Sequence, residues 1–350
     1  MKSLKKNSKG LILMISLWIL AILSLLCLGL AHRVIINLKL VKFQKDKMKC
    51  LYIAKAAIQK AISVLEKDAT SEVDGLGELW SRGFDQKAEG DGYIFKNVGV
   101  DDGFFTVSYL YDDTNSGSSV YFYGMSDEDR KININEANKE LLVSLLDILG
   151  ASDSESLADN IIYWRGDASE NTKDPYYESP QIPYPARKAP LKTIEELSLV
   201  KGFRDNLSLV KECEKFFTVY TQDNLININT TRPQILKAVF MSLGAESVTP
   251  GLSDRLVNDI IDFRDGDDGE ATDDDVLISQ DEIKNVIKKG LADIKETGWV
   301  NNQVFPFTVK SNLFRIDVSA GLNNSKISKK VTVIIDRSKQ PLQIRYWHEE

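Results

Sequence analysis

Histidine is the scarcest chemically useful residue of this sequence. The 350 residues contain two histidines, His32 and His348, one at the edge of an apolar run and one near the last residue. Imidazole supplies much of the acid–base catalysis and metal ligation that proteins perform near neutral pH. The sequence also has no glycine-rich phosphate loop and no Gly-x-Ser-x-Gly nucleophile elbow. These absences argue against most hydrolases and favour a protein that is not an enzyme.

Cysteine is nearly as rare, with three residues in the chain. Cys27 lies inside the apolar run, so Cys50 and Cys213 are the remaining possible pair. Their spacing gives neither a zinc motif nor a disulfide framework. The sequence leaves open whether these two thiols are joined.

Positive charge is scarce in the middle of the chain. The formal net charge is -7, and residues 126–300 contain 20 Lys/Arg against 34 Asp/Glu. Such a segment repels nucleic acid as a whole. The hydrophobic fraction of 43% is that of a globular protein with a sizeable core.

A long apolar run stands near the N-terminus. Four lysines precede a charge-free stretch from Leu11 to Ala31, which is long enough to span a bilayer of about 30 Å as a helix. Three interpretations fit it: a signal peptide cut after the small residues Gly29 and Ala31, an ordinary anchor, or a segment trimmed at Gly10 and kept. Basic residues flank both ends of the run, so charge gives only a weak orientation.

The apolar run continues into an amphipathic stretch. Between residues 31 and 66 apolar side chains recur at three- and four-residue steps, and neither proline nor glycine interrupts them. We predict one helix of more than 50 residues, whose first half lies in lipid and whose second half packs on a domain.

Two groups of β-rich segments are separated by helical sequence. The first group comprises residues 92–100, 103–111 and 119–124, and the second comprises 305–311, 313–321, 328–337 and 342–347. Aromatic and β-branched residues alternate with Asp, Asn, Gly and Ser turns in both groups. A sheet that begins in one group and ends in the other predicts that the material between them is an insertion.

The insertion contains an internal repeat. "KININEANKELLVSLLDILGA" (131–151) aligns with "LININTTRPQILKAVFMSLGA" (225–245) at an offset of 94 positions. "NIIYWRGD" then corresponds to "DIIDFRDGD", and "TIEELSLVKGF" to "SQDEIKNVIKKGL". Each copy predicts a strand-like entry, a helix, a glycine turn, a helix ending in Arg, an acidic loop and a final helix. The asparagines suit turns and helix caps.

The repeat resembles the helix-hairpin-helix template, whose glycine-rich hairpin presents backbone amides to a DNA phosphate. Here the hairpins read "ILGASDSES" and "SLGAESVTPG", so a phosphate would meet Asp153, Glu155 or Glu246. The sequence therefore favours a helical scaffold that presents a surface, and no nucleic acid is expected as a partner.

The whole layout resembles the K-type minor pseudopilin of the type II secretion system. The most specific segments are "KININEANKELL", "IIYWRGD" followed by "PYYESP", "IEELSLVKGF" and "ININTTRPQIL". The resemblance implies an α+β fold: a pilin-like long N-terminal helix plus an antiparallel sheet, with an inserted all-α domain of two SAM-like or helix-hairpin-helix-like repeats. The expected divisions are a leader 1–10, a transmembrane helix 11–31, a helical stem 32–66, pilin-like parts 67–125 and 301–350, and an inserted domain 126–300 with repeats 131–203 and 225–291.

The same resemblance implies processing at the N-terminus. Prepilin peptidase would cut between Gly10 and Leu11 and methylate the new terminus. Filament-stacking members of the family have Glu as the fifth mature residue, where it pairs with a neighbour's terminal amine inside the membrane. Here that residue is Ile15, as in the tip subunit of the family.

The acidic loops after each helix pair suggest calcium, since this ion takes six to eight oxygen ligands. Their spacing is not that of an EF-hand, but K-type proteins hold Ca2+ in the helical domain, which strengthens the expectation. The candidate ligands are Asp167, Glu170, Asp174, Asp265, Asp267, Asp268, Glu270, Asp273, Asp274 and Asp275.

The resemblance also implies a place in the cell and a set of partners. We expect a single-pass protein of the bacterial inner membrane, with a cytoplasmic N-terminus and a periplasmic bulk, that initiates or caps the pseudopilus during export. Expected partners are the I- and J-type minor pseudopilins, which would contact Leu38 and Val41, the prepilin peptidase and the inner-membrane assembly platform. The alternatives are a DNA-binding envelope protein of a competence-like system and a secreted enzyme freed after Ala31.

Overall fold

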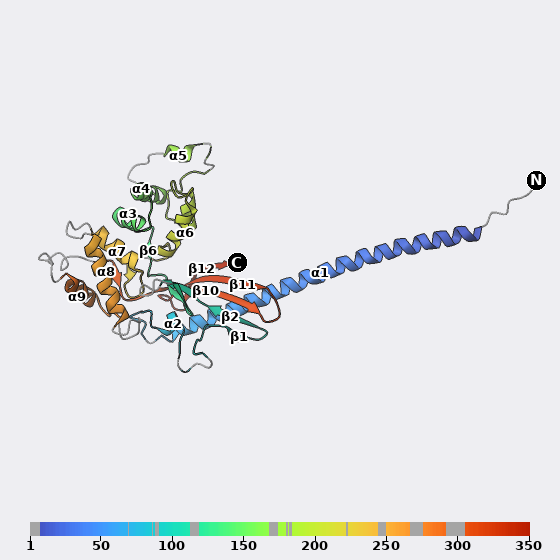
Figure 1. Cartoon of the computed structure of the whole chain (residues 1–350), viewed down its shortest axis with the longest axis horizontal. Helices are drawn as coiled ribbons and strands as arrows, with labels where there is room; N and C mark the ends of the chain where they lie inside the picture. The colour runs from blue at the N-terminus through green and yellow to red at the C-terminus, as the bar shows by residue number, and fades with distance from the viewer. Residues whose placement is uncertain are drawn as a thin grey trace, which may run out of the picture.

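A computed structural model describes most of the chain. It covers residues 8–68, 70–85, 87, 91–112, 119–167, 174–179, 181, 184–221, 223–243, 250–266, 276–291 and 305–350, with side chains for all of these except 8–10, 112 and 250. Helix α1 projects from a body in which the sheet packs against its C-terminal end, and helices α3 to α9 lie beyond the sheet (Figure 1).

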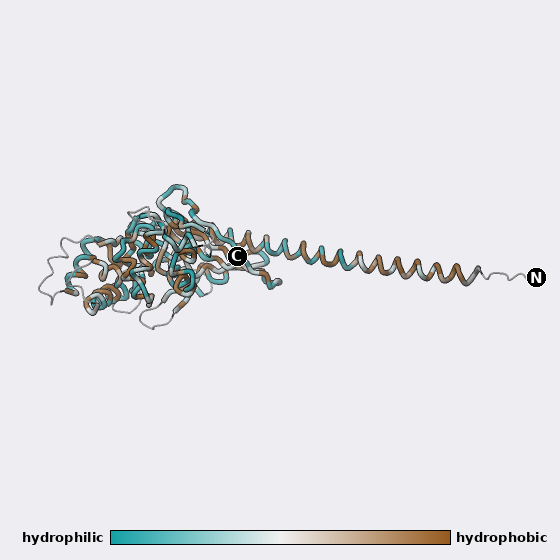
Figure 2. The backbone as a smooth tube through the Cα atoms, turned by 90° about the horizontal axis from the view of Figure 1, so that it is seen from above, coloured by the Kyte–Doolittle hydropathy of each residue, from teal (hydrophilic) through white to brown (hydrophobic). Residues whose placement is uncertain are grey.

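Helix α1 is a single α-helix of 59 residues, Ser8–Glu66. Its side chains are exposed over its first two thirds, and the hydrophobic colour dominates the N-terminal half of the helix in Figure 2. From Cys50 onward one face is buried, because small and branched side chains such as Ala54, Ala57 and Ile58 pack against the sheet. The prediction of one continuous helix is confirmed. By length and composition this helix can cross a membrane, and none of its most apolar window is buried.

An antiparallel sheet receives the C-terminal end of α1. Its path is β1 (Val98–Val100), β2 (Gly103–Val107), β10 (Leu313–Leu322), β11 (Ser328–Asp336) and β12 (Gln343–Glu349), and β5 (Ser126–Asp127) pairs with β10. β2 and β10 meet with Val107 opposite Val318. Strands from before and after the insertion therefore lie side by side, which confirms the predicted α+β class of a long helix and an antiparallel sheet with further helices.

Two short elements complete this part of the fold. Helix α2 (Leu79–Arg82) follows α1, and a separate hairpin joins β3 (Tyr109–Asp112) to β4 (Ser119–Phe122). The strand predicted over 92–100 is wrong for its first six residues, since only Val98–Val100 is a strand. Gly92 and Asn97 have left-handed backbones, with φ of 82° and 49°, and these turns interrupt any continuous strand.

The remaining helices form a second unit with its own hydrophobic core. They are α3 (Lys139–Ile148), α4 (Ser154–Arg165), α5 (Pro175–Glu178), the 3-10 helix η1 (Ile194–Leu199), α6 (Leu207–Phe216), α7 (Pro233–Ser242), α8 (Pro250–Asp265) and α9 (Gln280–Gly290). Buried side chains of α3 and α7, such as Leu142 and Val239, belong to one continuous cluster. The two repeats therefore share a core.

The helical unit is not entirely helical. β6 (Ile132–Asn133) pairs in parallel with β7 (Phe217–Thr218), and β8 (Ile226–Asn227) pairs in parallel with β9 (Phe307–Thr308). The predicted last helix of the first repeat is a 3-10 helix, which ends where Val200 is extended. Asn206 then caps α6 by accepting a hydrogen bond from the Leu209 amide at 3.2 Å.

The two cysteines outside the apolar run belong to different cores. Cys50 packs with α1 and the sheet, Cys213 packs among the helices, and both are free thiols. Burial raises the pKa of Cys213 to about 12. Because the thiolate is the reactive form, we expect Cys213 to resist iodoacetamide in the folded protein at pH 8 and to react within minutes in urea. Mass spectrometry of tryptic peptides measures this, and rapid labelling of folded Cys213 would contradict its placement.

Candidate functional site

The exposed face of α1 is the largest apolar surface that the structure describes. Exposed large side chains follow one another from Leu11 to Phe43. Leu38 and Val41, predicted to contact partner helices, are 63% and 60% exposed. Ile15 is also exposed, and the predicted cleavage bond between Gly10 and Leu11 lies near the start of the helix. Contiguous apolar surface of this extent marks membrane or protein contact.

The predicted calcium ligands fall largely on residues that the structure does not describe: Glu170, Asp267, Asp268, Glu270, Asp273, Asp274 and Asp275. Of the others, Asp167 forms an ion pair with Arg165 at 2.6 Å. Asp174 caps α5 through the Tyr176 amide and pairs with Lys201 at 3.1 Å. Asp265 ends α8. Within the described residues these three acids do not form a convergent cluster.

In each repeat an asparagine side chain forms two hydrogen bonds with the backbone of a leucine. The amide of Asn135 accepts a hydrogen bond from Leu191 N at 2.8 Å and donates one to Leu191 O at 3.0 Å. Asn229, 94 positions later, does the same with Leu277 at 3.0 and 2.9 Å. In each copy the asparagine side chain thus makes the pair of backbone hydrogen bonds that a neighbouring strand would otherwise make. It links the first segment of the repeat to the segment that follows the acidic loop.

In both repeats the arginine at the end of the second helix donates hydrogen bonds to the backbone of the first segment of that repeat. Arg165 donates to Ile134 O at 2.7 Å, and Arg264 donates to Thr231 O at 2.8 Å and to Ile228 O at 3.4 Å. The repeat was visible in the sequence, but the partners of its asparagines and arginines were not. Asn138 does cap α3, as such residues were expected to do.

We expect Asn229→Ala to lower the free energy of unfolding by about 1–3 kcal/mol. The change removes two hydrogen bonds and leaves the N–H and C=O of buried Leu277 without those partners. Urea unfolding followed by circular dichroism measures the loss. Asn324→Ala, at an exposed position in the turn after β10, is the control. Equal stability of the two variants would contradict the role of this amide.

A buried polar junction lies where the chain enters and leaves the helical unit. Asp127 Oδ2 accepts from the Ser311 hydroxyl at 2.5 Å and from Thr230. Asn227 donates to Ser311 Oγ at 2.7 Å and to Asp74 O at 3.1 Å. Burial raises the pKa of Asp127. The junction therefore joins the loop after α1, the second repeat and the start of β10 in one network.

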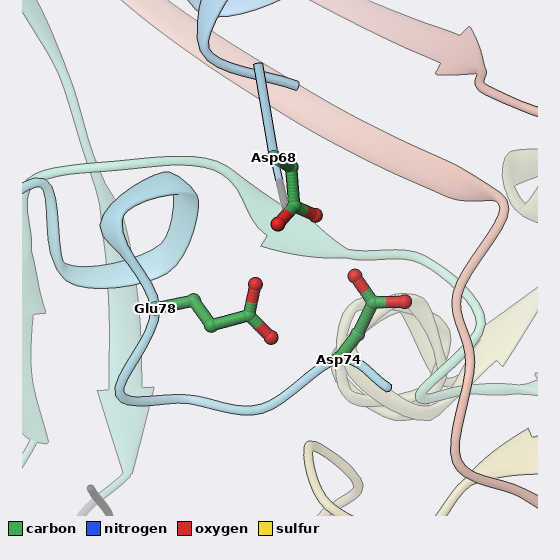
Figure 3. Close-up of side chains that lie close together, drawn as sticks. All are labelled: Asp68, Asp74 and Glu78. Carbon is green, nitrogen blue, oxygen red and sulfur yellow. The ribbon is translucent and has the colours of Figure 1, made fainter. Parts of the chain in front are cut away.

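Three further carboxylates converge beside this junction, in the segment between α1 and α2. Asp68, Asp74 and Glu78 point toward a common space in Figure 3, and one oxygen of each lies within 4.8 Å of the others. Arg337 donates to Asp68 at 2.7 Å and to Asp74 at 2.6 Å. In the sequence these acids resemble an ordinary acidic turn, so nothing distinguished them from a solvated loop.

Comparison with known proteins finds a matching family model and similar solved structures. Residues 124–222 match the family model described as type II secretion system (T2SS), protein K. A chain of the crystal structure of the GspK-GspI-GspJ complex from the enterotoxigenic Escherichia coli type 2 secretion system shares the fold with a TM-score of 0.59. The two chains are 17% identical over 89% of this chain and 99% of that chain. No curated protein matches the sequence.

Proposed function

We propose that this chain, whose residues 124–222 match the protein K domain of the type II secretion system, initiates or caps the pseudopilus of such a system during protein export. The resemblance to K-type minor pseudopilins is confirmed by that domain and by the shared fold. The observation that carries the proposal is the combination of this domain with a long helix whose apolar face is uncovered. The role is structural, and other components supply the energy of export.

The proposed partners are the I- and J-type minor pseudopilins. The similar solved structure is a complex of GspK with GspI and GspJ, which supports partners of these types. The exposed face of α1, including Leu38 and Val41, offers them apolar surface at helical spacing.

Maturation is proposed to occur at the N-terminus of α1. Prepilin peptidase would cut between Gly10 and Leu11 and methylate Leu11, which leaves the apolar helix in place. Ile15, the fifth residue after that bond, has no carboxylate to pair with a neighbour's amine, as suits a subunit with nothing stacked above it.

One N-terminal apolar helix fits a single-pass membrane anchor. We place it in the bacterial inner membrane, with the N-terminus in the cytoplasm and the bulk of the chain in the periplasm, where the assembly platform of the system would receive it. The window from Leu11 to Ala31 has the length of the hydrocarbon core.

Calcium in the acidic loops is part of the same proposal. Asp167, Asp174 and Asp265 stand at the described edges of the two loops. Calorimetric titration of the detergent-solubilised protein should show heat on adding Ca2+. A double variant, Asp273→Asn with Asp274→Asn, should reduce that heat, and no heat at millimolar ion would overturn this part.

The DNA-binding alternative is not favoured. In the first hairpin the Asp153 carboxylate caps α4, accepting from Ser156 N at 3.3 Å. It occupies the helix N-terminus, where a phosphate would otherwise bind. The neighbouring Glu155 adds a second negative charge in the first turn.

The N-terminal residue and intact mass of the membrane-extracted protein test the proposal. A chain that begins at methylated Leu11 is the expected result. A start at His32 would mean a secreted protein without its helix, and an unprocessed Met1 would mean an ordinary anchor. Either of these two results would overturn the pseudopilin proposal.

A further inference from the structure

The cluster of Asp68, Asp74 and Glu78 lies outside the repeats and outside the proposed calcium loops. All three residues lie within positions 68–78, between α1 and α2. Their side chains approach from three directions, Asp68 from one side of the space, Glu78 from another and Asp74 from the third (Figure 3). One oxygen from each lies within 4.8 Å of the other two.

One carboxylate oxygen of Asp74 has no hydrogen-bond donor among the described residues. The residue is 0% exposed. Its Oδ2 accepts from Ser311 N at 2.7 Å and from Arg337 Nη2 at 2.6 Å. Its Oδ1 is buried and has no hydrogen-bond partner within the described part of the chain. A buried acceptor without a donor has lost its hydrogen bonds to water and gained none from the protein, which is rare in folded proteins.

Thr70 brings a further oxygen to the cluster. Its hydroxyl lies 2.9 Å from Asp68 Oδ1 and 3.2 Å from Glu78 Oε2. Asp68 Oδ1 also accepts from Thr70 N at 3.0 Å. The Thr70 oxygen has lone pairs of its own, so it adds a fourth oxygen ligand beside the three carboxylates.

The charges around this space do not balance. Three carboxylates face one guanidinium, Arg337, which leaves two negative charges in a buried setting bordered by Trp80. Trp80 Nε1 donates to Glu78 Oε2 at 2.9 Å. Ionised carboxylates in such a buried setting are costly unless a positive charge compensates them.

We propose that Asp68, Asp74 and Glu78, together with the Thr70 hydroxyl, bind one calcium ion. Calcium–oxygen distances of 2.3–2.6 Å put ligands on opposite sides of the ion about 4.6–5.2 Å apart, and the three oxygens lie within 4.8 Å. Magnesium would draw opposite ligands to about 4.2 Å and retain its waters. Two positive charges match the two unbalanced carboxylates.

A route to solvent leads past the cluster. A surface cleft of about 560 Å³ is lined by Asp68, Ser71 and Arg337 among others. An ion bound here would join the end of α1 to the turn after β11, which contains Arg337, and through Asp74 to the polar junction. The site would therefore brace the helix against the body.

Terbium luminescence tests the site, because Trp80 contacts a proposed ligand and can transfer excitation to a bound Tb3+. The full-length protein in detergent, stripped of metal with EGTA, should give sensitised emission that Ca2+ displaces. Glu78→Gln should weaken Tb3+ binding at least tenfold. Glu72→Gln should not, since Glu72 is exposed and pairs with Lys310. Trp80→Phe should lose the emission and keep Ca2+ binding within a fewfold by calorimetry.

The acidic loops provide the second control. Asp167→Asn with Asp174→Asn should leave the component that depends on Glu78 unchanged, so failure of the loop sites and failure of this site are distinguishable. Asp74→Asn is a second variant with the same expected loss, and circular dichroism checks its fold.

The proposal is overturned if Tb3+ affinity is the same in the wild type, Glu78→Gln and Asp74→Asn. It is also overturned if Glu78→Gln raises the melting temperature while Ca2+ does not change that of the wild type. In that case a proton, not a metal ion, compensates the surplus charge.

Discussion

Replacing Arg337 by methionine is expected to lower the free energy of unfolding by about 3–5 kcal/mol, because it removes one partner of buried ion pairs. Arg337 donates to Asp68 at 2.7 Å, to Asp74 at 2.6 Å and to Ser311 O at 2.6 Å, and its side chain is 10% exposed. Methionine preserves much of the apolar contact with Phe314 and removes the charge. Urea unfolding monitored by Trp fluorescence measures the effect.

Lys310→Met is the matched control for this prediction. Lys310 pairs with Glu72 at 2.8 Å, but both side chains are exposed, so the expected change is below about 1 kcal/mol. Arg337→Lys should fall between the two, since an ammonium cannot reach both carboxylates as the guanidinium fork does. If Arg337→Met is as stable to urea as the Lys310→Met control, the ion pairs of Arg337 with Asp68 and Asp74 do not stabilise the fold.

The double change Leu38→Asp with Val41→Asp is expected to abolish co-purification with the proposed partner pseudopilins. Covering one such side chain contributes about 1.5–3 kcal/mol, so losing two weakens binding by at least about 100-fold, before the cost of burying carboxylates is counted. Both residues are exposed, so the fold of the body should not change. Detergent pull-down of tagged protein measures the association, and circular dichroism measures the fold.

Lys45→Asp provides the control on the same helix. It introduces the same carboxylate at an exposed position outside the apolar series. Partner recovery should remain within about twofold of the wild type, which is a small difference of free energy. If the double variant retains its partners equally well, the exposed face at these two positions is not the contact.

The elements that repeat a simple pattern were predictable from the sequence. The long helix follows from uninterrupted apolar spacing between residues 11 and 66, and the split sheet follows from two groups of alternating segments. The internal repeat could be aligned by eye, since "ININ" occurs in both copies. Local periodicity determines these features, so a single sequence contains the information.

Contacts between distant segments could not be predicted in the same way. Asn229 and Leu277 are 48 positions apart, and Asp74 and Arg337 are far more distant. Such pairs depend on how finished elements pack, which no local pattern records. The break of the expected strand at Asn97 likewise depends on one residue with positive φ. The carboxylate cluster was missed for the first reason, because its counter-charge comes from the other end of the chain.

Helix α1 has a mechanical consequence. One unbroken helix of 59 residues is about 88 Å long, and its final turns are built into the core beneath the sheet. No break in the helix separates the exposed segment from the body, so a rotation of one end displaces the other. Tilting its base by one degree would swing the opposite end by about 1.5 Å, given a rise of 1.5 Å per residue. A tilt imposed at the N-terminal end of the helix would therefore be passed to the body at its C-terminal end.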